Sequence, residues 1–206
     1  DDSVDAVEGM MFDRGYNSPY FVTNQNTMEA VLEKPYIFLF DGKISSVSQV
    51  VPILQAAAAD SRSLLIIAED IIGEALALLV VNKANNTIRV CSVKAPEFGA
   101  RRTAVLEDMA ILTGGTVLSP EKGNILEKMK PSEYKQYFGE TRMATITSKD
   151  TTLIDGKGDV KAIENRLIEI KNQIDIAKSL FEKENLQDRL GKMTGGVAII
   201  HVGGHS

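Results

Sequence analysis

The chain has 206 residues, of which 44% are hydrophobic and 25% charged, and its formal net charge is −5. This is an ordinary globular composition, so it argues against a disordered or fibrous chain, and the negative charge argues against a nucleic-acid binder. The length suits one domain. No apolar run approaches the roughly 20 residues that span a bilayer. The single cysteine, Cys91, cannot form an internal disulfide, so we expect a buried thiol and a soluble protein from a reducing compartment.

Both ends of the chain fall within sequence that has an ordered pattern. The chain starts without methionine, and its last residues directly follow a strand-like run at 197–202. We therefore expect a domain cut from a larger parent protein, to which its function belongs.

The middle of the chain alternates β-rich apolar runs with helical patterns. The apolar runs lie at residues 36–40, 64–68 and 87–93. The helical patterns lie at residues 45–59, 73–82 and 101–112. A turn is expected at 41–43, and Ser45 or Ser46 caps the first helix. Continuous apolar strands separated by helices are typical of a parallel sheet covered on both faces, so the sequence predicts an α/β layer.

The second half of the chain has a different pattern. Residues 116–159 contain short runs broken by prolines and glycines, which predicts short strands and loops rather than another helix. From residue 160 to about 178, apolar residues recur at helical spacing with charges between them. A second helix continues this pattern and ends at Gly195 and Gly196.

Residues that could carry enzyme chemistry are few. His201 and His205 lie at the very end, far from Cys91, and no phosphate-binding glycine motif occurs, so we expect no metal and no cofactor. Glu69 and Asp70 follow an apolar run, where α/β enzymes place catalytic acids. A small-molecule enzyme that uses these acids with Arg102 is one alternative, although a helix cap is the simpler interpretation.

The first two helices carry more apolar residues than one buried stripe requires. The stripe of the first helix comprises Val47, Val50, Val51, Leu54 and Ala58. In the second helix, apolar residues nearly surround the axis: Leu76, Leu78, Leu79, Val80 and Val81. Such helices are either deeply buried, as in a purely structural assembly domain, or they present an apolar groove for partner segments. The periodicity leaves both interpretations open.

Long strings of residues resemble, in collinear order, the group I chaperonins (the GroEL family). They lie at residues 7–21 (Val-Glu-Gly-Met-Met-Phe-Asp-Arg-Gly-Tyr-Asn-Ser-Pro-Tyr-Phe), 64–70, 73–77, 80–82, 93–96, 112–117, 149–152 and 195–198. The resemblance covers almost the whole chain, although residues 129–148 share little with the family.

The resemblance implies an apical domain: a β-sandwich core flanked by helices, with an α/β part that carries two groove helices. The apical domain would span residues 9–196, between intermediate-domain stubs at 1–8 and 197–206. Its groove would bind exposed hydrophobic segments of non-native polypeptides and, alternatively, the mobile loop of the co-chaperonin. The matching groove residues are Tyr16, Tyr20, Phe21, Val51, Leu54, Leu76, Val80 and Val81.

The resemblance also implies a larger machine. Gly9 and Gly196 match hinge glycines about which the apical domain rotates. If they serve only rotation, alanine in their place should leave this chain stable. The parent would form homo-oligomeric rings in the bacterial cytoplasm or an organellar matrix, without nucleic-acid or membrane partners. ATP and Mg would bind an equatorial domain outside this chain, so we expect the chain itself not to be an enzyme.

Overall fold

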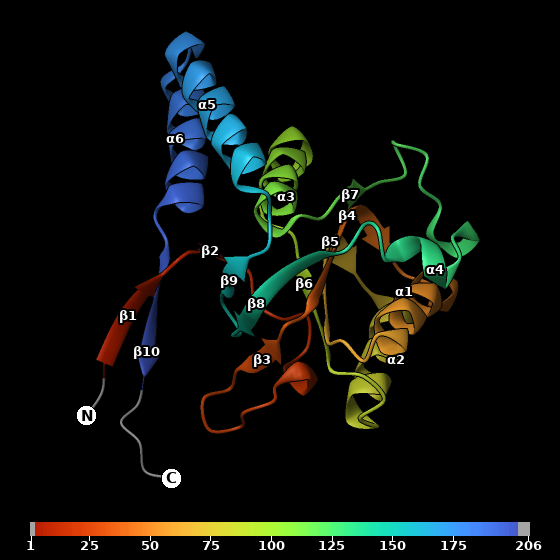
Figure 1. The fold of residues 1–206 in the computed structure, drawn as a ribbon. Helices are drawn as coiled ribbons and strands as arrows, with labels where there is room; N and C mark the ends of the chain where they lie inside the picture. Colours follow the sequence, from red (N-terminus) through yellow and green to blue (C-terminus); the bar gives the residue numbers. More distant parts are fainter. Residues whose placement is uncertain (1–2, 202–206) are drawn as a thin grey trace.

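The computed structural model describes residues 3–201, which form a mixed α/β fold with one eight-stranded sheet and a separate two-stranded ribbon (Figure 1). The order of the main sheet is β2-β9-β8-β4-β5-β6, and β3 pairs with β8 and β7 with β4. The strands are β1 (Ser3–Val7), β2 (Gly9–Phe12), β3 (Ala30–Glu33), β4 (Tyr36–Ile44), β5 (Leu64–Ile71), β6 (Val90–Lys94), β7 (Val117–Leu118), β8 (Gly139–Ile146), β9 (Thr151–Gly156) and β10 (Val197–His201). The helices are α1 (Val47–Ala59), α2 (Gly73–Ala84), α3 (Gly99–Thr113), α4 (Pro131–Tyr134), α5 (Val160–Ile176) and α6 (Leu180–Thr194), with short 3-10 turns at Pro19–Phe21 and Leu126–Lys128.

The predicted parallel layer is confirmed in strands β7, β4, β5 and β6. Helix α1 connects β4 to β5 and α2 connects β5 to β6, so the chain moves in one direction across the sheet. Helix α3 then leads back across the sheet to β7. Because such crossovers are right-handed, α1 and α2 cover one face and α3 the other (Figure 1). Cys91 lies fully buried in β6, as expected.

The prediction of a turn at residues 41–43 is wrong. Strand β4 continues to Ile44, which pairs with Ile71 of β5, and the register shifts between Phe40 and Lys43. A side chain on Gly42 would press against the ring of Phe40 and against Pro120. The register shift shows that Asp41 and Gly42 form a bulge inside a buried strand. Glycine is suited to this position because the neighbouring side chains pack closely against it.

Strand β6 begins at Val90, later than the predicted start at residue 87. The chain around Thr87 instead closes α2, because the amide of Thr87 donates to the carbonyl of Asn82 (3.0 Å) and Asn86 has a φ of 54°. The extra turn lengthens α2 at the expense of the strand.

The segment 116–159 is mainly strands and loops, as predicted, but it also contains the short helix α4. Tyr134 at the end of α4 is fully buried, and its ring lies 5.6 Å from that of Phe38. Strand β8 pairs with β4 at one end and with β3 and β9 beyond it. The parallel and antiparallel strands are thus joined in one hydrogen-bonded path.

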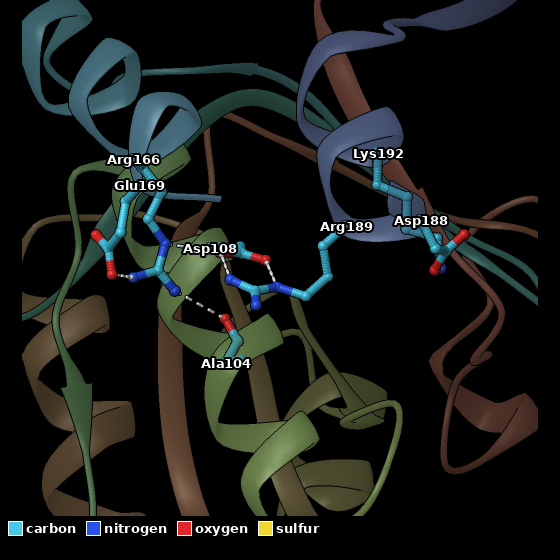
Figure 2. A network of polar contacts seen from close by, with 7 residues as sticks. All are labelled: Ala104, Asp108, Arg166, Glu169, Asp188, Arg189 and Lys192. Atoms are coloured by element: carbon cyan, nitrogen blue, oxygen red, sulfur yellow. Dashed lines mark hydrogen bonds and ion pairs between the residues drawn. The ribbon is translucent and has the colours of Figure 1, made fainter. Parts of the chain in front are cut away.

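Helices α5 and α6 form an antiparallel hairpin that rests on α3 (Figure 1). Ile170 of α5 and Leu186 of α6 are buried near the middle of their helices. Asp108 of α3 is fully buried beneath the hairpin, and it accepts hydrogen bonds from Arg166 of α5 and Arg189 of α6 (Figure 2).

The two-stranded ribbon pairs β1 with β10 in antiparallel register, from Ser3 opposite His201 to Val7 opposite Val197. It joins the main body through Glu8 and through the pair Gly195 and Gly196, next to the base of α6 (Figure 1). Across residues 3–201, none of the helices has the length and apolar character needed to cross a membrane.

Candidate functional site

An apolar hollow of about 260 Å³ lies between α1 and α2. Its lining comprises Val51, Leu54, Gln55, Ala58, Leu78, Asn82, Thr87 and Ile88. Within the described part of the chain, no charged side chain lines this hollow, and α1 contains no charged residue at all. Five of the eight lining residues are apolar, while Gln55, Asn82 and Thr87 are neutral polar groups.

The hollow arises because each helix turns only part of its apolar surface to the sheet. Helix α1 buries Val50, Ile53, Leu54 and Ala57, which follow the spacing i, i+3, i+4 and i+7. Helix α2 buries only Ala75 and Leu79. Leu76 and Val80 pack partly against the core, while Leu78 lines the hollow. Val81 is exposed, so the second helix is not the deeply buried cylinder that one interpretation of its sequence required.

Helix α1 begins where expected. Ser46 is its N-cap residue, and the side chain of Gln49 accepts a hydrogen bond from the backbone amide of Ser46 (3.0 Å). This interaction satisfies an amide at the helix start and fixes the first turn. The start of α2 is tied to this turn, because the amide of Ala75 donates to the carbonyl of Ser45 (3.3 Å).

The eight groove residues named from the resemblance occupy different environments. Val51 and Leu54 line the hollow. Leu76 and Val80 are half-buried and pack against the core, whereas Val81 is 52% exposed. The structure therefore brings two of the five helical candidates into the hollow and leaves the other three outside its lining.

Two of the three aromatic candidates, Tyr20 and Phe21, belong to the 3-10 turn Pro19–Phe21, which contacts both α2 and β6. Lys83 of α2 donates to the carbonyl of Val22 next to this turn (2.9 Å). Tyr16 instead forms a β-bridge with Val93 of β6. Tyr20 is 72% exposed, while the hydroxyl of Tyr16 donates to the carbonyl of Met28 (3.1 Å). Phe21 is completely buried, so it anchors the turn and presents no ring to solvent.

Sequence reasoning did not assign six of the residues that line the hollow. Ala58 and Leu78 had a signal, because both belong to the apolar excess of their helices. Asn82 follows Leu78 by one helical turn, and its side-chain amide donates to the carbonyl of Leu78 (2.8 Å). Polar residues such as Asn82 carry no periodic signal, so only the packing of α2 against α1 identifies them.

The alternative enzyme site at the strand ends is occupied by ion pairs. Arg102 of α3 donates to Asp41 (2.8 Å) and lies 3.2 Å from a carboxylate oxygen of Glu69. One carboxylate oxygen of Asp70 accepts from the backbone amide of Ile71 (3.0 Å). Arg102 therefore links two acidic side chains at this edge and ties α3 to the sheet.

The structure offers no metal centre in the part of the chain that it describes, since no three His, Cys, Asp or Glu side chains gather there. His205 lies outside the described residues, and the structure gives only the backbone of His201.

The two candidate hinge glycines lie where the ribbon meets the body. Gly196 has a φ of +66°, a left-handed conformation that favours glycine. A side chain on Gly9 would meet the carbonyl oxygen of Leu153 and would approach a methyl group of Val197 to 2.8 Å. Alanine at either position would strain the local backbone, which argues against the expectation that it leaves the chain stable.

No family model matches this chain. The case for a function therefore rests on the geometry of the hollow, on the exposed apolar residues near it and on the resemblance of the sequence strings.

Proposed function

We propose that this chain is the apical, substrate-binding domain of a group I chaperonin. In this proposal, the hollow between α1 and α2 binds exposed hydrophobic segments of non-native polypeptides. The mobile loop of a co-chaperonin competes for the same place. The observation that carries the proposal is an uncharged apolar hollow between two helices that are both only partly covered by the rest of the chain.

The surroundings of the hollow support a polypeptide ligand. Exposed apolar side chains lie on or next to the two helices: Tyr20 (72%), Val81 (52%), Ile72 (45%) and Val47 (39%). An apolar surface rimmed by polar groups is typical of protein interaction sites. A hollow of about 260 Å³ exceeds the ~150 Å³ that accepts a benzene ring, so it has room for apolar side chains of a bound segment.

Binding by one domain should be weak. Apolar contact contributes about 25 cal/mol for each Å² removed from water, and the ordering of a flexible segment offsets much of this gain. Several copies arranged in a ring would raise the apparent affinity without new contacts. The proposal therefore includes a homo-oligomeric ring. It also includes intermediate-domain stubs at 1–8 and 197–206 and a β-sandwich core of the apical domain.

A matched pair of variants tests the proposal. Ala58 lines the hollow and Ala59 does not, yet both are exposed residues in the last turn of α1. Ala58→Glu should weaken binding of a fluorescein-labelled Ser-Leu repeat peptide by about tenfold, because it places a carboxylate in a dry apolar contact. Ala59→Glu introduces the same charge in the same turn and should bind like the unmodified chain. Equal binding by both variants in fluorescence anisotropy would refute the groove.

Salt provides a second test of the same site. Because the lining carries no charge, raising the ionic strength from about 0.05 M to 0.5 M should not weaken peptide binding. A steep loss of affinity with salt would instead indicate that charged groups outside the hollow hold the peptide.

The wider part of the proposal concerns the parent protein. It places the parent in the bacterial cytoplasm or an organellar matrix, where ATP and Mg bind an equatorial domain and drive rotation of this one. Calorimetric titration of the present chain with Mg-ATP should then give no binding heat. A saturable signal would contradict the assignment of this chain to the apical domain.

A further inference from the structure

A second cavity, of about 410 Å³, lies where the β1–β10 ribbon joins the main body. It opens between the chain on both sides of Gly9, the end of α3, the start of α5 and the end of α6. This volume is within the usual range of small-molecule sites, roughly 300–1,000 Å³. The cavity is separate from the hollow between α1 and α2, with which it shares no lining residue.

Most of the wall is apolar. Met10, Leu153 and Met193 are buried at its back, and the first turn of α5 adds Val160 and Ile163. Val160 lines the cavity and is 70% exposed, so a bound ligand would cover part of its side chain. The apolar body of a ligand would therefore gain contact with side chains from four separate elements.

The charged side chains and the carboxyl-terminal helix ends that face the cavity are all negative. Glu8 and Glu164 are the ionisable residues of the lining, and both are exposed. The cavity also receives the carboxyl-terminal ends of two helices, α3 at Thr113 and α6 at Thr194. Such helix ends carry a partial negative charge from their free carbonyl groups.

Neither the start of α5 nor the lysine next to Met193 cancels this field. The start of α5 faces the cavity, but the carboxylate of Asp159 caps it by accepting from the amide of Ala162 (2.9 Å). Lys192 of α6 pairs with Asp188 at 3.1 Å and lies outside the lining (Figure 2). Of the residues described, no lysine or arginine lines the cavity.

We propose that this cavity binds small amphipathic cations, in which an apolar ring or chain carries one protonated amine. The amine lies near Glu8 and Glu164, and the apolar body lies against Met10, Leu153 and Met193. A neutral molecule of the same shape loses the electrostatic part of this interaction, and a carboxylate is repelled. The peptide hollow, whose lining is uncharged, makes no such distinction.

Three probes of matched shape test the charge preference: cyclohexylmethylamine, cyclohexylmethanol and cyclohexanecarboxylate. Each is titrated into the full chain with labelled methyl groups while NMR shifts of Met10, Ile163 and Met193 are followed. The amine should bind about fivefold more tightly than the alcohol, a ratio typical of a favourable surface charge contact. The carboxylate should bind more weakly than either.

Two variants connect this preference to the wall. Glu164→Gln should bring the affinity for the amine close to that for the alcohol, and it leaves an exposed helix position polar. Glu184→Gln is the control, because Glu184 is an exposed residue of α6 outside the lining. It should change neither affinity.

Each of three outcomes would overturn the proposal. They are equal binding of amine and alcohol, an unchanged amine affinity in Glu164→Gln, and the absence of shifts at the three methyl groups at any concentration of the amine. None of them bears on the peptide hollow, since the labelled peptide and these probes report on separate cavities.

Discussion

The carboxylate of Asp108 is held by two parallel hydrogen bonds from Arg189. Nε of Arg189 lies 2.7 Å from Oδ2 of Asp108, and Nη2 lies 2.9 Å from Oδ1 (Figure 2). Arg166 adds a bond of 2.8 Å to Oδ1 and reaches the carbonyl of Ala104 at 3.3 Å. One fully buried side chain of α3 therefore binds both helices of the α5–α6 hairpin. Two-pronged contacts of this kind fix orientation as well as distance.

Asp108→Asn should destabilise the chain strongly. The amide cannot balance two arginines that are only 17% and 11% exposed, and breaking such a buried pair costs about 3–5 kcal/mol. Urea unfolding measures the loss. Glu169→Gln is the control, because Glu169 is exposed and lies 3.7 Å from Arg166, so its change should stay within about 0.5 kcal/mol. A loss below about 1 kcal/mol in Asp108→Asn would show that apolar packing alone holds the hairpin.

Glycine-to-alanine substitutions should have opposite effects at two places. Gly9→Ala should lower the free energy of unfolding by more than about 1 kcal/mol, because the new methyl group meets the backbone of Leu153. Gly191 lies within α6, where nothing surrounds the position of an added methyl group, so Gly191→Ala should stabilise the chain by about 0.5–1 kcal/mol. Thermal unfolding of the two variants compares them directly. Stabilisation by both would mean that β2 can shift away from β9.

Much of the fold could be predicted from the sequence because its periodicity is strong. The buried strands β4, β5 and β6 and the four long helices α1, α3, α5 and α6 all lie close to their predicted positions. The prediction of a turn at 41–43 was wrong because Asp41 and Gly42 are typical turn residues. Only the contacts of Gly42 with Phe40 and Pro120 show that these residues form a bulge. Local sequence does not encode such contacts.

The candidate site was only partly predictable for a related reason. The predicted stripe of α1 is buried only at Val50 and Leu54, whereas Val47 is exposed. Ile53 lies outside that stripe and is buried as well. A helix with apolar residues on several sides does not determine which side meets the sheet. The polar lining residues, such as Asn82, become visible only when the two helices are placed side by side.

Alkaline pH should destabilise the chain through Tyr36. Burial of Tyr36, together with its hydrogen bond to Asp60 (2.6 Å), raises its pKa from 10 to about 12. Below pH 10 the phenol is protonated in both the folded and unfolded states, so its full contribution is present. As pH rises from 10 to 12 the unfolded chain loses this proton first, and the contribution disappears.

The Tyr36→Phe variant isolates this effect. Burial also raises the pKa of Cys91 and that of Tyr134, so the chain as a whole should lose stability at high pH. The difference in unfolding free energy between the unmodified chain and Tyr36→Phe should shrink between pH 10 and 12, by at most about 3 kcal/mol. Urea titrations at several pH values measure it. A constant difference would show that Tyr36 ionises equally easily in both states.

The last prediction asks how far the binding surface extends beyond the hollow. Val81 is 52% exposed and lies outside the lining, yet the resemblance includes it in the groove. Val81→Glu should change the free energy of unfolding by only about 0.5 kcal/mol, since the carboxylate stays in water. It should nevertheless weaken binding of the labelled Ser-Leu peptide about fivefold, because a segment that crosses the hollow also covers the rim of α2.

Two comparisons make that result decisive. Val80 is half-buried against the core, so Val80→Glu should cost more stability than Val81→Glu, about 1–3 kcal/mol. Ala77 is an exposed residue of the same helix outside the lining, and Ala77→Glu should leave both stability and peptide affinity unchanged. If Val81→Glu binds peptide normally while Ala58→Glu does not, the bound segment is confined to the hollow and the rim of α2 takes no part. If Ala77→Glu weakens binding as much as Val81→Glu, a general effect of negative charge on α2 is responsible, and the rim contact is refuted.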